Sequence, residues 1–434
     1  CAHLWWETGR RDFSSLSAEQ ITEDHLQQAN TSLAHLTRPF LPKQGRRHVG
    51  PSASQETGRP SIHYVSHHWS SGYGVAGLRL FQALADLGVP LRWSPIEFDE
   101  DDPLIPRHIR TDLSIEPYRE VEMTPDVVVL HCVPELLPAL RHLRPKGGAL
   151  VLHTVWEHDL LQAHWPRLLN QFDGIIVPTT WNAEAFKRSG VRVPIAVVPH
   201  VANTDVADMN WLEQPPVSAD QSFMVHSIAS WSLRKAPWFT LEAFARAFDH
   251  SDALFVLQTS EHLVDWELPN PAGPPHLART TPWTVASILR DHHPTGKVHV
   301  ATRSRTFAEI QGLHKRSDCW LSLPRAEGWD LGAFDAATAG TPVITTSHGG
   351  PLEYLDPQAS LLIPGRLIPN ANLPGTMWME PDIDAAVDAL RAVSREPETF
   401  RARAAAQASR LRSTYAPDVV GRQFLAALQE MGLT

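Results

Sequence analysis

Two acidic residues, Glu327 and Asp335, flank a predicted strand-to-helix junction in the segment Leu323–Ile344, with seven residues between them. Glu327 lies in the loop, where a carboxylate can accept hydrogen bonds from sugar hydroxyls. The backbone N–H groups of Trp329–Gly332 open the helix and can hold a diphosphate. Asp335, one to two turns further, can accept hydrogen bonds from a ribose. Both acids are therefore expected to be acceptors rather than metal ligands. A plainer interpretation, a capped helix with solvated acids, suits either carboxylate alone better than the whole segment.

A diphosphate beside two carboxylates needs positive charge nearby, and Arg234 and Lys235 supply it after an earlier predicted strand. Adjacent side chains along a chain rarely point the same way. We therefore expect one of the two, Lys235, to point into the site and the other to be a solvated surface charge.

A glycine-rich turn opens the N-terminal half of the chain. Gly72, Gly74 and Gly77 follow a predicted strand and precede a helix, and Glu97 lies about twenty residues further on, as in the dinucleotide-binding fingerprint. The pattern favours a nicotinamide enzyme. Any strand-to-helix turn that brings backbone close to a ligand also favours glycine, however, and a tight turn without a ligand is a second interpretation.

The elements that position these residues alternate between short apolar strands and longer amphipathic helices. The first series has a helix at Val75–Leu87 and strands at Ile62–Ser66, Leu91–Ile96, Val127–Val133, Ala149–His153, Gly174–Pro178 and Ile195–Pro199. The second has helices at Trp238–Phe248 and Phe307–Arg316 and strands at Phe223–Ala229, Leu254–Gln258, Val298–Ala301, Cys319–Leu323, Val343–Thr345 and Leu361–Ile363. This rhythm predicts an α/β fold with two doubly wound, Rossmann-like parallel-sheet domains that face each other across a cleft.

The boundaries of these domains follow breaks in the pattern. Residues 1–60 are first polar and then rich in proline and glycine, which is typical of an extension and linker. Residues 61–210 form the N-terminal domain. Residues 211–415 form the C-terminal domain, after a stretch at 203–221 without periodicity. Residues 416–434 contain an amphipathic helix, Asp418–Met431, that is expected to pack back on the body.

Composition excludes several classes of protein. Of the 434 residues, 43% are hydrophobic and 20% are charged, as in soluble globular proteins, and the net charge of −10 argues against binding nucleic acid. Cys1, Cys132 and Cys319 lack metal-type spacing and are interpreted as thiols in a reducing compartment. The apolar runs are far shorter than the roughly 20 residues of a membrane-spanning helix. We expect a cytoplasmic protein without a transmembrane segment, and the oligomeric state is open.

Histidine and tryptophan are both frequent, with 23 and 15 residues. The pairs His67–His68 and His292–His293 lack the i, i+4 helical spacing and the third ligand of a metal site, so neither a metal nor a cofactor is expected. An aromatic face can stack on a sugar ring. The tryptophans that stand at predicted strand ends are Trp69, Trp156, Trp231 and Trp329.

The order of these motifs resembles the retaining GT-B glycosyltransferases of family 4 (glycosyl transferases group 1). The resemblance rests on Trp-Ser-x-Arg-Lys at 231–235, Glu-Gly-Trp at 327–329 with an acid eight positions after the Glu, Gly340–Ile344 and Gly349–Leu355. In the N-terminal half it rests on Trp156–Glu157, Val177–Asn182 and Val197–His200. It spans roughly residues 61–430 and is most specific over 223–355.

The resemblance implies transfer of a hexose-type sugar from a UDP- or GDP-sugar to a saccharide, lipid-linked or protein acceptor, with retention of configuration. It implies that Lys235 and the backbone of Trp329–Gly332 hold the diphosphate, Glu327 the sugar hydroxyls and Asp335 the ribose, while the base lies near Thr302–Thr306. The donor-binding residues expected in all are Gly72, Gly74, Trp231, Arg234, Lys235, Thr302, Arg303, Glu327, Gly328, Trp329, Asp330, Leu331, Gly332 and Asp335.

For catalysis, the resemblance implies front-face attack, in which the donor phosphate accepts the acceptor's proton and no dedicated base is needed. Side chains still position the acceptor and stabilise the charge that develops on the sugar. The candidates are Glu327 and, at strand ends of the N-terminal domain, His131, His153 and Glu157; Gly72 and Gly74 leave room for the donor.

The chain departs from the family's pattern at four positions. It has Asp330 where the family has Gly, Gly332 for Pro, Asp335 for Glu and Ser230 for a frequent Arg. A carboxylate at position 330 would repel a neighbouring diphosphate. A catalytically silent, sugar-binding protein of the same fold would account for these departures. An NAD(P)-dependent oxidoreductase would account for the N-terminal glycines but leaves Lys235 and the two acids without a role.

Overall fold

The computed structural model describes residues 58–68, 71–96, 113–119, 121–203, 223–248, 253–259, 285, 288–290, 297–302, 305, 307–370 and 372–434. These residues form two compact units. The N-terminal unit contains the described residues up to Val201 together with Tyr415–Thr434, and the C-terminal unit runs from Ala202 to Thr414. The expectations for the linker up to residue 57 and for Trp69, Glu97, His292–His293 and Arg303 lie outside the described residues.

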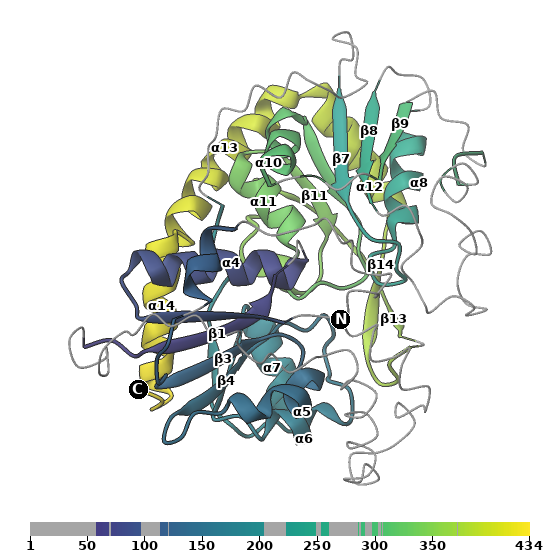
Figure 1. Ribbon diagram of the computed structural model, residues 1–434. Helices are drawn as coiled ribbons and strands as arrows, with labels where there is room; N and C mark the ends of the chain where they lie inside the picture. Colours follow the sequence, from purple (N-terminus) through teal and green to yellow (C-terminus); the bar gives the residue numbers. More distant parts are fainter. Residues whose placement is uncertain are drawn as a thin grey trace. The chain divides into compact units, whose positions relative to one another are not determined.

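The N-terminal unit is built on a six-stranded parallel sheet in the order β2-β1-β3-β4-β5-β6 (Figure 1). Its strands are β1 (Ile62–His67), β2 (Leu91–Ile96), β3 (Val127–His131), β4 (Ala149–His153), β5 (Gly174–Val177) and β6 (Ile195–Val197). Its α-helices are α4 (Gly72–Asp86), α5 (Leu137–Leu140), α6 (Trp165–Leu169), α7 (Thr180–Arg188) and α14 (Pro417–Glu430). Every residue of β3 and β4 is buried, as expected for parallel strands that are covered on both faces.

The terminal helix α14 belongs to the N-terminal unit, where it packs on α4 (Figure 1). The two helices approach closely at Gly421, because a Cβ atom there would lie 2.7 Å from Leu87 Cδ1. The last helix of the sequence is therefore part of the first unit rather than of the second.

The C-terminal unit has a second six-stranded parallel sheet, in the order β12-β11-β10-β7-β8-β9. Its strands are β7 (Met224–Ile228), β8 (Leu254–Gln258), β9 (Lys297–Ala301), β10 (Cys319–Ser322), β11 (Val343–Thr346) and β12 (Leu361–Ile363). Its helices are α8 (Pro237–Ala247), α10 (Phe307–Arg316), α11 (Leu331–Ala339), α12 (Ile383–Arg395) and α13 (Pro397–Thr414). An antiparallel hairpin, β13 (Gly365–Pro369) and β14 (Met377–Pro381), follows β12.

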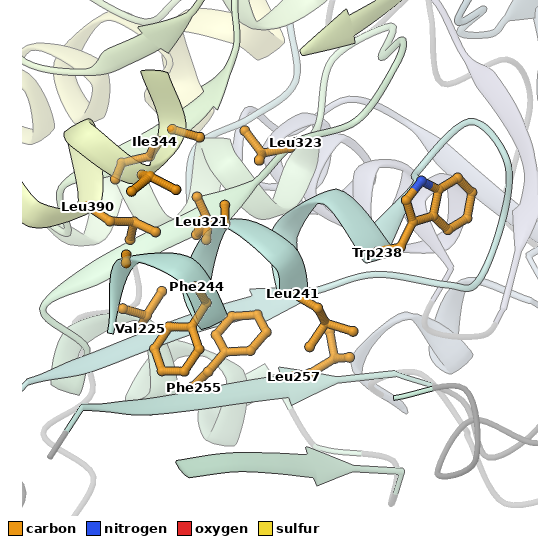
Figure 2. Packing of buried hydrophobic residues seen from close by; sticks show 14 of the residues in the cluster. Val225, Trp238, Leu241, Phe244, Phe255, Leu257, Leu321, Leu323, Ile344 and Leu390 are labelled. Carbon is orange, nitrogen blue, oxygen red and sulfur yellow. The ribbon is translucent and has the colours of Figure 1, made fainter. Parts of the chain in front are cut away.

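The core of the C-terminal unit lies between its sheet and the helices α8 and α12 (Figure 2). Phe244 of α8 stacks on Phe255 of β8 with ring centroids 5.2 Å apart, and Leu390 of α12 is fully buried in the same cluster. Both sheets are parallel and flanked by helices, which confirms the prediction of two doubly wound, Rossmann-like domains. Among the described residues, no helix is long and apolar enough to span a membrane.

Candidate active site

The strand order of the C-terminal unit reverses between β7 and β10, which lie side by side. In an open parallel sheet, ligands bind beyond the carboxyl ends of the strands at such a switch point. The loop after β7 carries Arg234 and Lys235, and the loop after β10 carries Glu327. The topology therefore brings together the basic and acidic residues that the sequence places about ninety positions apart.

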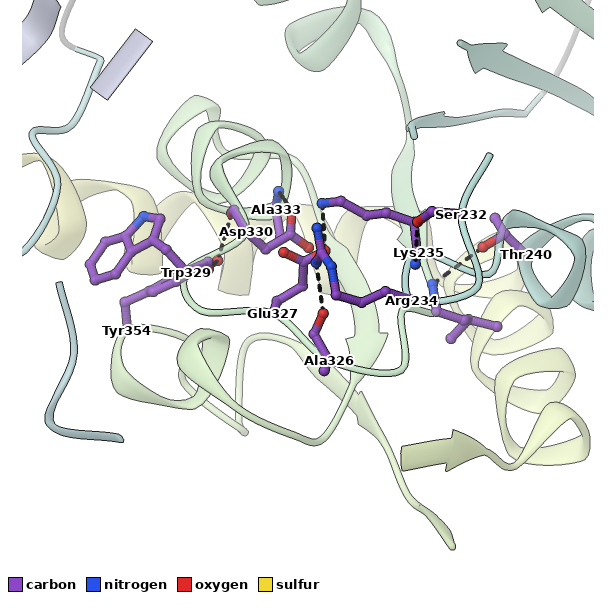
Figure 3. A network of polar contacts seen from close by, with 11 residues as sticks. Ser232, Arg234, Lys235, Thr240, Ala326, Glu327, Trp329, Asp330, Ala333 and Tyr354 are labelled. Atoms are coloured by element: carbon purple, nitrogen blue, oxygen red, sulfur yellow. Dashed lines mark hydrogen bonds and ion pairs between the residues drawn. The ribbon is translucent and has the colours of Figure 1, made fainter. Parts of the chain in front are cut away.

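Glu327 is the centre of a polar network in this unit (Figure 3). Its carboxylate is almost completely buried, and Oε1 lies 2.9 Å from Nη1 of Arg234 and in contact with Nζ of Lys235. Burial alone would raise the pKa of Glu327, but the two neighbouring cations hold this pKa below its ordinary value. Glu327 is therefore an ionised carboxylate that shares two positive charges.

Both basic side chains reach the same carboxylate, so the expectation that one of them is a solvated surface charge is wrong. Alternation of side chains holds along a strand, but these residues lie in a tight turn. Ser232 Oγ accepts a hydrogen bond from the Lys235 N–H at 3.0 Å, and Ala236 takes a left-handed conformation with φ 43° before Pro237 starts α8. Arg234 also donates from Nη1 to the Ala326 carbonyl at 2.9 Å, which ties the two loops together.

Asp330 is the N-cap of α11 and has a left-handed backbone with φ 64°. Its Oδ1 accepts a hydrogen bond from the Ala333 N–H at 3.3 Å, whereas Oδ2 is buried and has no hydrogen-bond partner in the described part of the chain. Burial and the nearby Glu327 charge raise the pKa of Asp330 to about 6, against the opposing effects of Lys235, the Ala333 N–H and Arg234.

The segment that starts at Gly349 packs against the backbone of the loop that carries Glu327, which we call the acidic loop. Gly350 donates its N–H to the Glu327 carbonyl at 2.8 Å, and a Cβ atom at Gly350 would lie 2.0 Å from the Gly328 carbonyl oxygen. The Tyr354 hydroxyl donates to the Trp329 and Asp330 carbonyls, each at 3.0 Å. Sequence reasoning did not assign Tyr354 to the site, although it lies within the Gly349–Leu355 motif.

Trp329 packs against the rings of Phe334 and Tyr354, with centroids 5.0 and 4.8 Å apart, and is 3% exposed. Trp156 and Trp231 are buried as well. None of these three indoles exposes a face on which a sugar ring could stack, so they are core residues. Packing explains why position 332 is a glycine, because a Cβ atom there would lie 2.5 Å from Cη2 of Trp320.

The other expected donor residues of the C-terminal unit lie on three elements. Gly328 is buried beside Glu327, and Leu331 is the first residue of α11. Asp335 lies further along α11 with a mostly buried side chain. Thr302 follows β9 and is half-buried.

The N-terminal unit holds a second polar cluster at the carboxyl ends of its strands. His131 ends β3 and His153 ends β4, and their rings stack with centroids 4.0 Å apart. His200 lies 6.1 Å from His153 between ring centroids. Burial lowers the pKa of all three, that of His153 to about 3, so the rings are neutral. Tyr64 Oη is 2.7 Å from His131 Nδ1, while neither ring nitrogen of His153 has a hydrogen-bond partner among the described residues.

The glycine-rich turn packs against this cluster. A Cβ atom at Gly77 would lie 3.2 Å from His131 Nδ1, so this glycine lets α4 approach the sheet. Gly74 lies inside the first turn of α4, where its N–H donates to the N-cap Ser71, and Gly72 is exposed at the start of the helix. Tyr73 donates to the Val155 carbonyl at 3.0 Å, and Glu157 is half-buried nearby.

Part of the chain matches a known protein family. Residues 284–423 match the family described as "Family 4 Glycosyltransferase in conflict systems". The matched segment contains Glu327, Asp330 and Asp335 but not Arg234 and Lys235. A comparison with curated protein sequences gives no match.

Several solved structures resemble the chain over most of its length. Anabaena HepE in complex with UDP-glucose is 14% identical with a TM-score of 0.58, over 86% of this chain and 100% of that one. Sucrose-phosphate synthase from Thermosynechococcus elongatus is 14% identical with a TM-score of 0.60, over 86% and 99%. The UDP-forming trehalose-phosphate synthase from Burkholderia xenovorans is 14% identical with a TM-score of 0.59, over 86% and 100%.

Likeness at this level of identity concerns the fold. Each of these structures is matched over nearly its whole length, and the share of this chain that is covered exceeds either unit alone. The paired Rossmann-like sheets and the matched family segment agree with it. The chain therefore has the GT-B fold of glycosyltransferases.

Proposed function

We propose that the protein is a nucleotide-sugar-dependent glycosyltransferase whose C-terminal unit binds the donor. The observation that carries the proposal is the Glu327 carboxylate held between Arg234 and Lys235 at the switch point, beside the start of α11. The family match over 284–423 and the structural likeness to HepE, which was solved with UDP-glucose, support the same assignment.

The donor is proposed to bind across the carboxyl edge of the C-terminal sheet. Its diphosphate accepts hydrogen bonds from the backbone N–H groups at Trp329–Gly332 and pairs with Lys235 and Arg234. These cations are shared with Glu327 when no donor is bound, so the diphosphate draws them toward itself and leaves carboxylate oxygens for the sugar hydroxyls. Asp335 accepts from the ribose, and the base lies near Thr302 and Arg303. We expect UDP or GDP as the nucleotide.

Transfer is proposed to proceed with retention and without a metal or other cofactor. The acceptor hydroxyl oxygen bonds to the anomeric carbon while the bond between that carbon and the diphosphate oxygen breaks. The leaving diphosphate, stabilised by the two cations, accepts the proton of the acceptor hydroxyl. Of the catalytic candidates in the N-terminal unit, half-buried Glu157 is proposed to position the acceptor hydroxyl, whereas His131 and His153 are each 1% exposed and do not reach an acceptor directly. The acceptor is a saccharide or another hydroxyl compound.

Thermal unfolding tests the donor site directly. UDP or GDP at a concentration far above its Kd should raise the melting temperature, because a ligand that binds only the folded state stabilises it. Lys235→Ala should remove most of this shift relative to its own ligand-free protein, and Arg234→Ala should reduce it. Lys187→Ala removes an exposed lysine of the N-terminal unit and should leave the shift unchanged.

Two outcomes would contradict the assignment. An undiminished shift in the Lys235→Ala protein would remove the diphosphate site from the switch point. Tight binding of NAD(H) or NADP(H) in place of nucleotide sugars would favour an oxidoreductase. Where a donor binds, release of UDP or GDP separates an enzyme from a silent sugar-binding protein, and the anomeric configuration of the product by NMR tests retention.

A further inference from the structure

Asp330 places a second carboxylate at the very point where the proposed donor diphosphate approaches the chain. The N-terminus of α11 attracts anions through its free N–H groups, yet Asp330 already caps this end and is 7% exposed. A diphosphate bound there would meet two carboxylates, Glu327 and Asp330. Glu327 is neutralised by its two cations, but no ion pair to Asp330 is found among the described residues.

The hydrogen bonds of Asp330 show which of its oxygens lacks a partner among the described residues. Oδ1 accepts from the Ala333 N–H and is thereby fixed toward the helix. Oδ2 is buried without a partner in the described part of the chain, and a carboxylate oxygen left in that state costs free energy. A proton on Oδ2 would turn this unsatisfied acceptor into a hydrogen-bond donor, for which an oxygen of the donor diphosphate can be the acceptor.

We infer that Asp330 binds the donor diphosphate as the neutral carboxylic acid, so that the protein takes up one proton for each donor molecule bound. The inference rests on the proposed function and adds a specificity residue to it. The proton comes from solvent and goes to Oδ2, the Oδ2–H then donates to a phosphate oxygen, and the donor keeps its own charge.

The groups around Asp330 act in both directions on its ionisation. Glu327 disfavours the ionised form, whereas Lys235, Arg234 and the Ala333 N–H favour it, and the Tyr354 hydroxyl is already used by the Asp330 carbonyl. Burial and Glu327 prevail, and they raise the pKa of Asp330 to about 6 in the donor-free protein. Above that pH the neutral fraction falls about tenfold for each pH unit, and the donor affinity should fall with it.

Calorimetric titration with UDP-glucose, or with GDP-mannose if UDP-glucose does not bind, tests the inference. A nucleotide sugar is chosen because it has no terminal phosphate, whose own second ionisation near pH 6 would interfere. The Kd of the wild-type protein should rise about tenfold between pH 7 and pH 8. Titrations at pH 7.5 in two buffers of different ionisation enthalpy should show uptake of about one proton.

Two variants separate charge from hydrogen bonding. Asp330→Asn keeps a neutral donor and Asp330→Gly removes the side chain, and both tolerate the left-handed backbone. Both should bind with an affinity independent of pH, Asp330→Asn at least tenfold tighter than wild type at pH 8. An affinity of the wild-type protein that does not change with pH, or a pH dependence that persists in Asp330→Asn, would overturn the inference.

Two further outcomes have distinct meanings. If Mg²⁺ restores tight wild-type binding at pH 8 relative to EDTA, a cation replaces the proton and the inference is wrong. If no nucleotide sugar binds to the wild type or to either variant at any pH, the proposed function itself fails. The proton uptake is measured on the wild-type protein, so the inference stays testable even where a variant does not fold.

Discussion

Arg325 stands between the two loops that carry the proposed donor site. Its guanidinium lies over the rings of Trp238, Phe239 and Trp378, at 5.5, 5.3 and 5.3 Å from their centroids. Its Nη1 donates to the Leu233 carbonyl at 3.2 Å, and its backbone N–H donates to the Arg234 carbonyl at 2.8 Å. Arg325 therefore connects the loop that carries Arg234 and Lys235, the loop that carries Glu327, and the strand β14 that carries Trp378.

We predict that Arg325→Ala lowers nucleotide-sugar affinity about tenfold and the free energy of unfolding by about 2 kcal/mol. The variant loses cation–π contacts worth ~0.5–2 kcal/mol and a hydrogen bond worth ~1 kcal/mol. Arg325→Lys keeps the charge but not the planar fork and should lie between wild type and Arg325→Ala. Titration calorimetry and urea unfolding measure both effects.

The control is Arg366→Ala in the exposed hairpin, which should change neither quantity, since the side chain of Arg366 is 79% exposed. A loss of stability in Arg325→Ala without any loss of nucleotide affinity would show that Arg325 is structural only.

At the scale of elements, α14 packs on α4 of the N-terminal unit through a close contact at Gly421. Gly421 faces α4, where a Cβ atom would meet Leu87 Cδ1 at 2.7 Å and the Ala83 carbonyl at 3.4 Å. Alanine is the better helix former by about 1 kcal/mol, so a change to alanine would stabilise an isolated α14. In the protein, the half-buried Leu87 side chain must turn aside to admit the added methyl group, which offsets this gain.

We predict that Gly421→Ala lowers the free energy of unfolding by no more than about 1 kcal/mol, because Leu87 can turn aside and the gain in helix propensity offsets the cost. Gln423→Ala, on the exposed side of the same helix, should stay within about 0.5 kcal/mol of wild type. Chemical unfolding of the two variants measures the difference. A loss of more than about 3 kcal/mol would mean that Leu87 cannot turn aside and that the contact between α14 and α4 is rigid.

The elements that sequence patterns predict well are those whose pattern reports burial. Strands such as β3 and β4 form continuous apolar runs because both faces are covered, and the predicted strands differ from the observed ones by at most two residues at either end. The hairpin β13–β14 was not predicted, because β13 is mostly exposed and has no apolar alternation. The helix α13 buries only Ala404, Gln407, Ala408 and Leu411, which leaves a weak helical pattern.

In the candidate site, too, some features follow from the sequence pattern and others do not. The meeting of Glu327 with Lys235 follows from strand order, because both stand at the ends of strands that flank the switch point. The direction of Arg234 depends on the left-handed turn at Ala236, and the burial of Trp329 depends on Phe334 and Tyr354. These features arise from tertiary contacts that no local pattern encodes.

At the scale of the whole molecule, buried histidines make stability depend on pH. Among the described residues, burial lowers the pKa of the partly exposed His299 and of seven deeply buried histidines. The pKa is about 3 for His63 and His153 and about 4 for His164. The seven are His63, His67, His131, His153, His164, His200 and His226. In the unfolded chain each histidine titrates near pH 6.5. Unfolding below pH 6.5 therefore takes up protons, and stability falls as the pH falls.

Two buried acids act in the opposite direction. Burial raises the pKa of Glu135 to about 7 and that of Asp330 to about 6, so the stability linked to these groups is present at low pH and is lost as the pH rises. The histidines outnumber them. The net effect between pH 6.5 and pH 5 is uptake of several protons on unfolding, each of which contributes ~1.4 kcal/mol per pH unit.

We predict that the melting temperature falls by roughly 10–20 °C between pH 7.5 and pH 5.5 at constant ionic strength, given ~2–4 °C per kcal/mol in units of this size. His153→Phe tests the cause, because the His153 ring makes no hydrogen bond among the described residues and phenylalanine has a similar shape. This variant should lose less stability on acidification than wild type, by about one proton's share, whereas His142→Gln at an exposed position should behave as wild type. A melting temperature that stays constant from pH 7.5 to pH 5.5 would show that these histidines are not excluded from solvent. In that case the carboxyl ends of β1, β3 and β4 would be less tightly packed than the structure indicates.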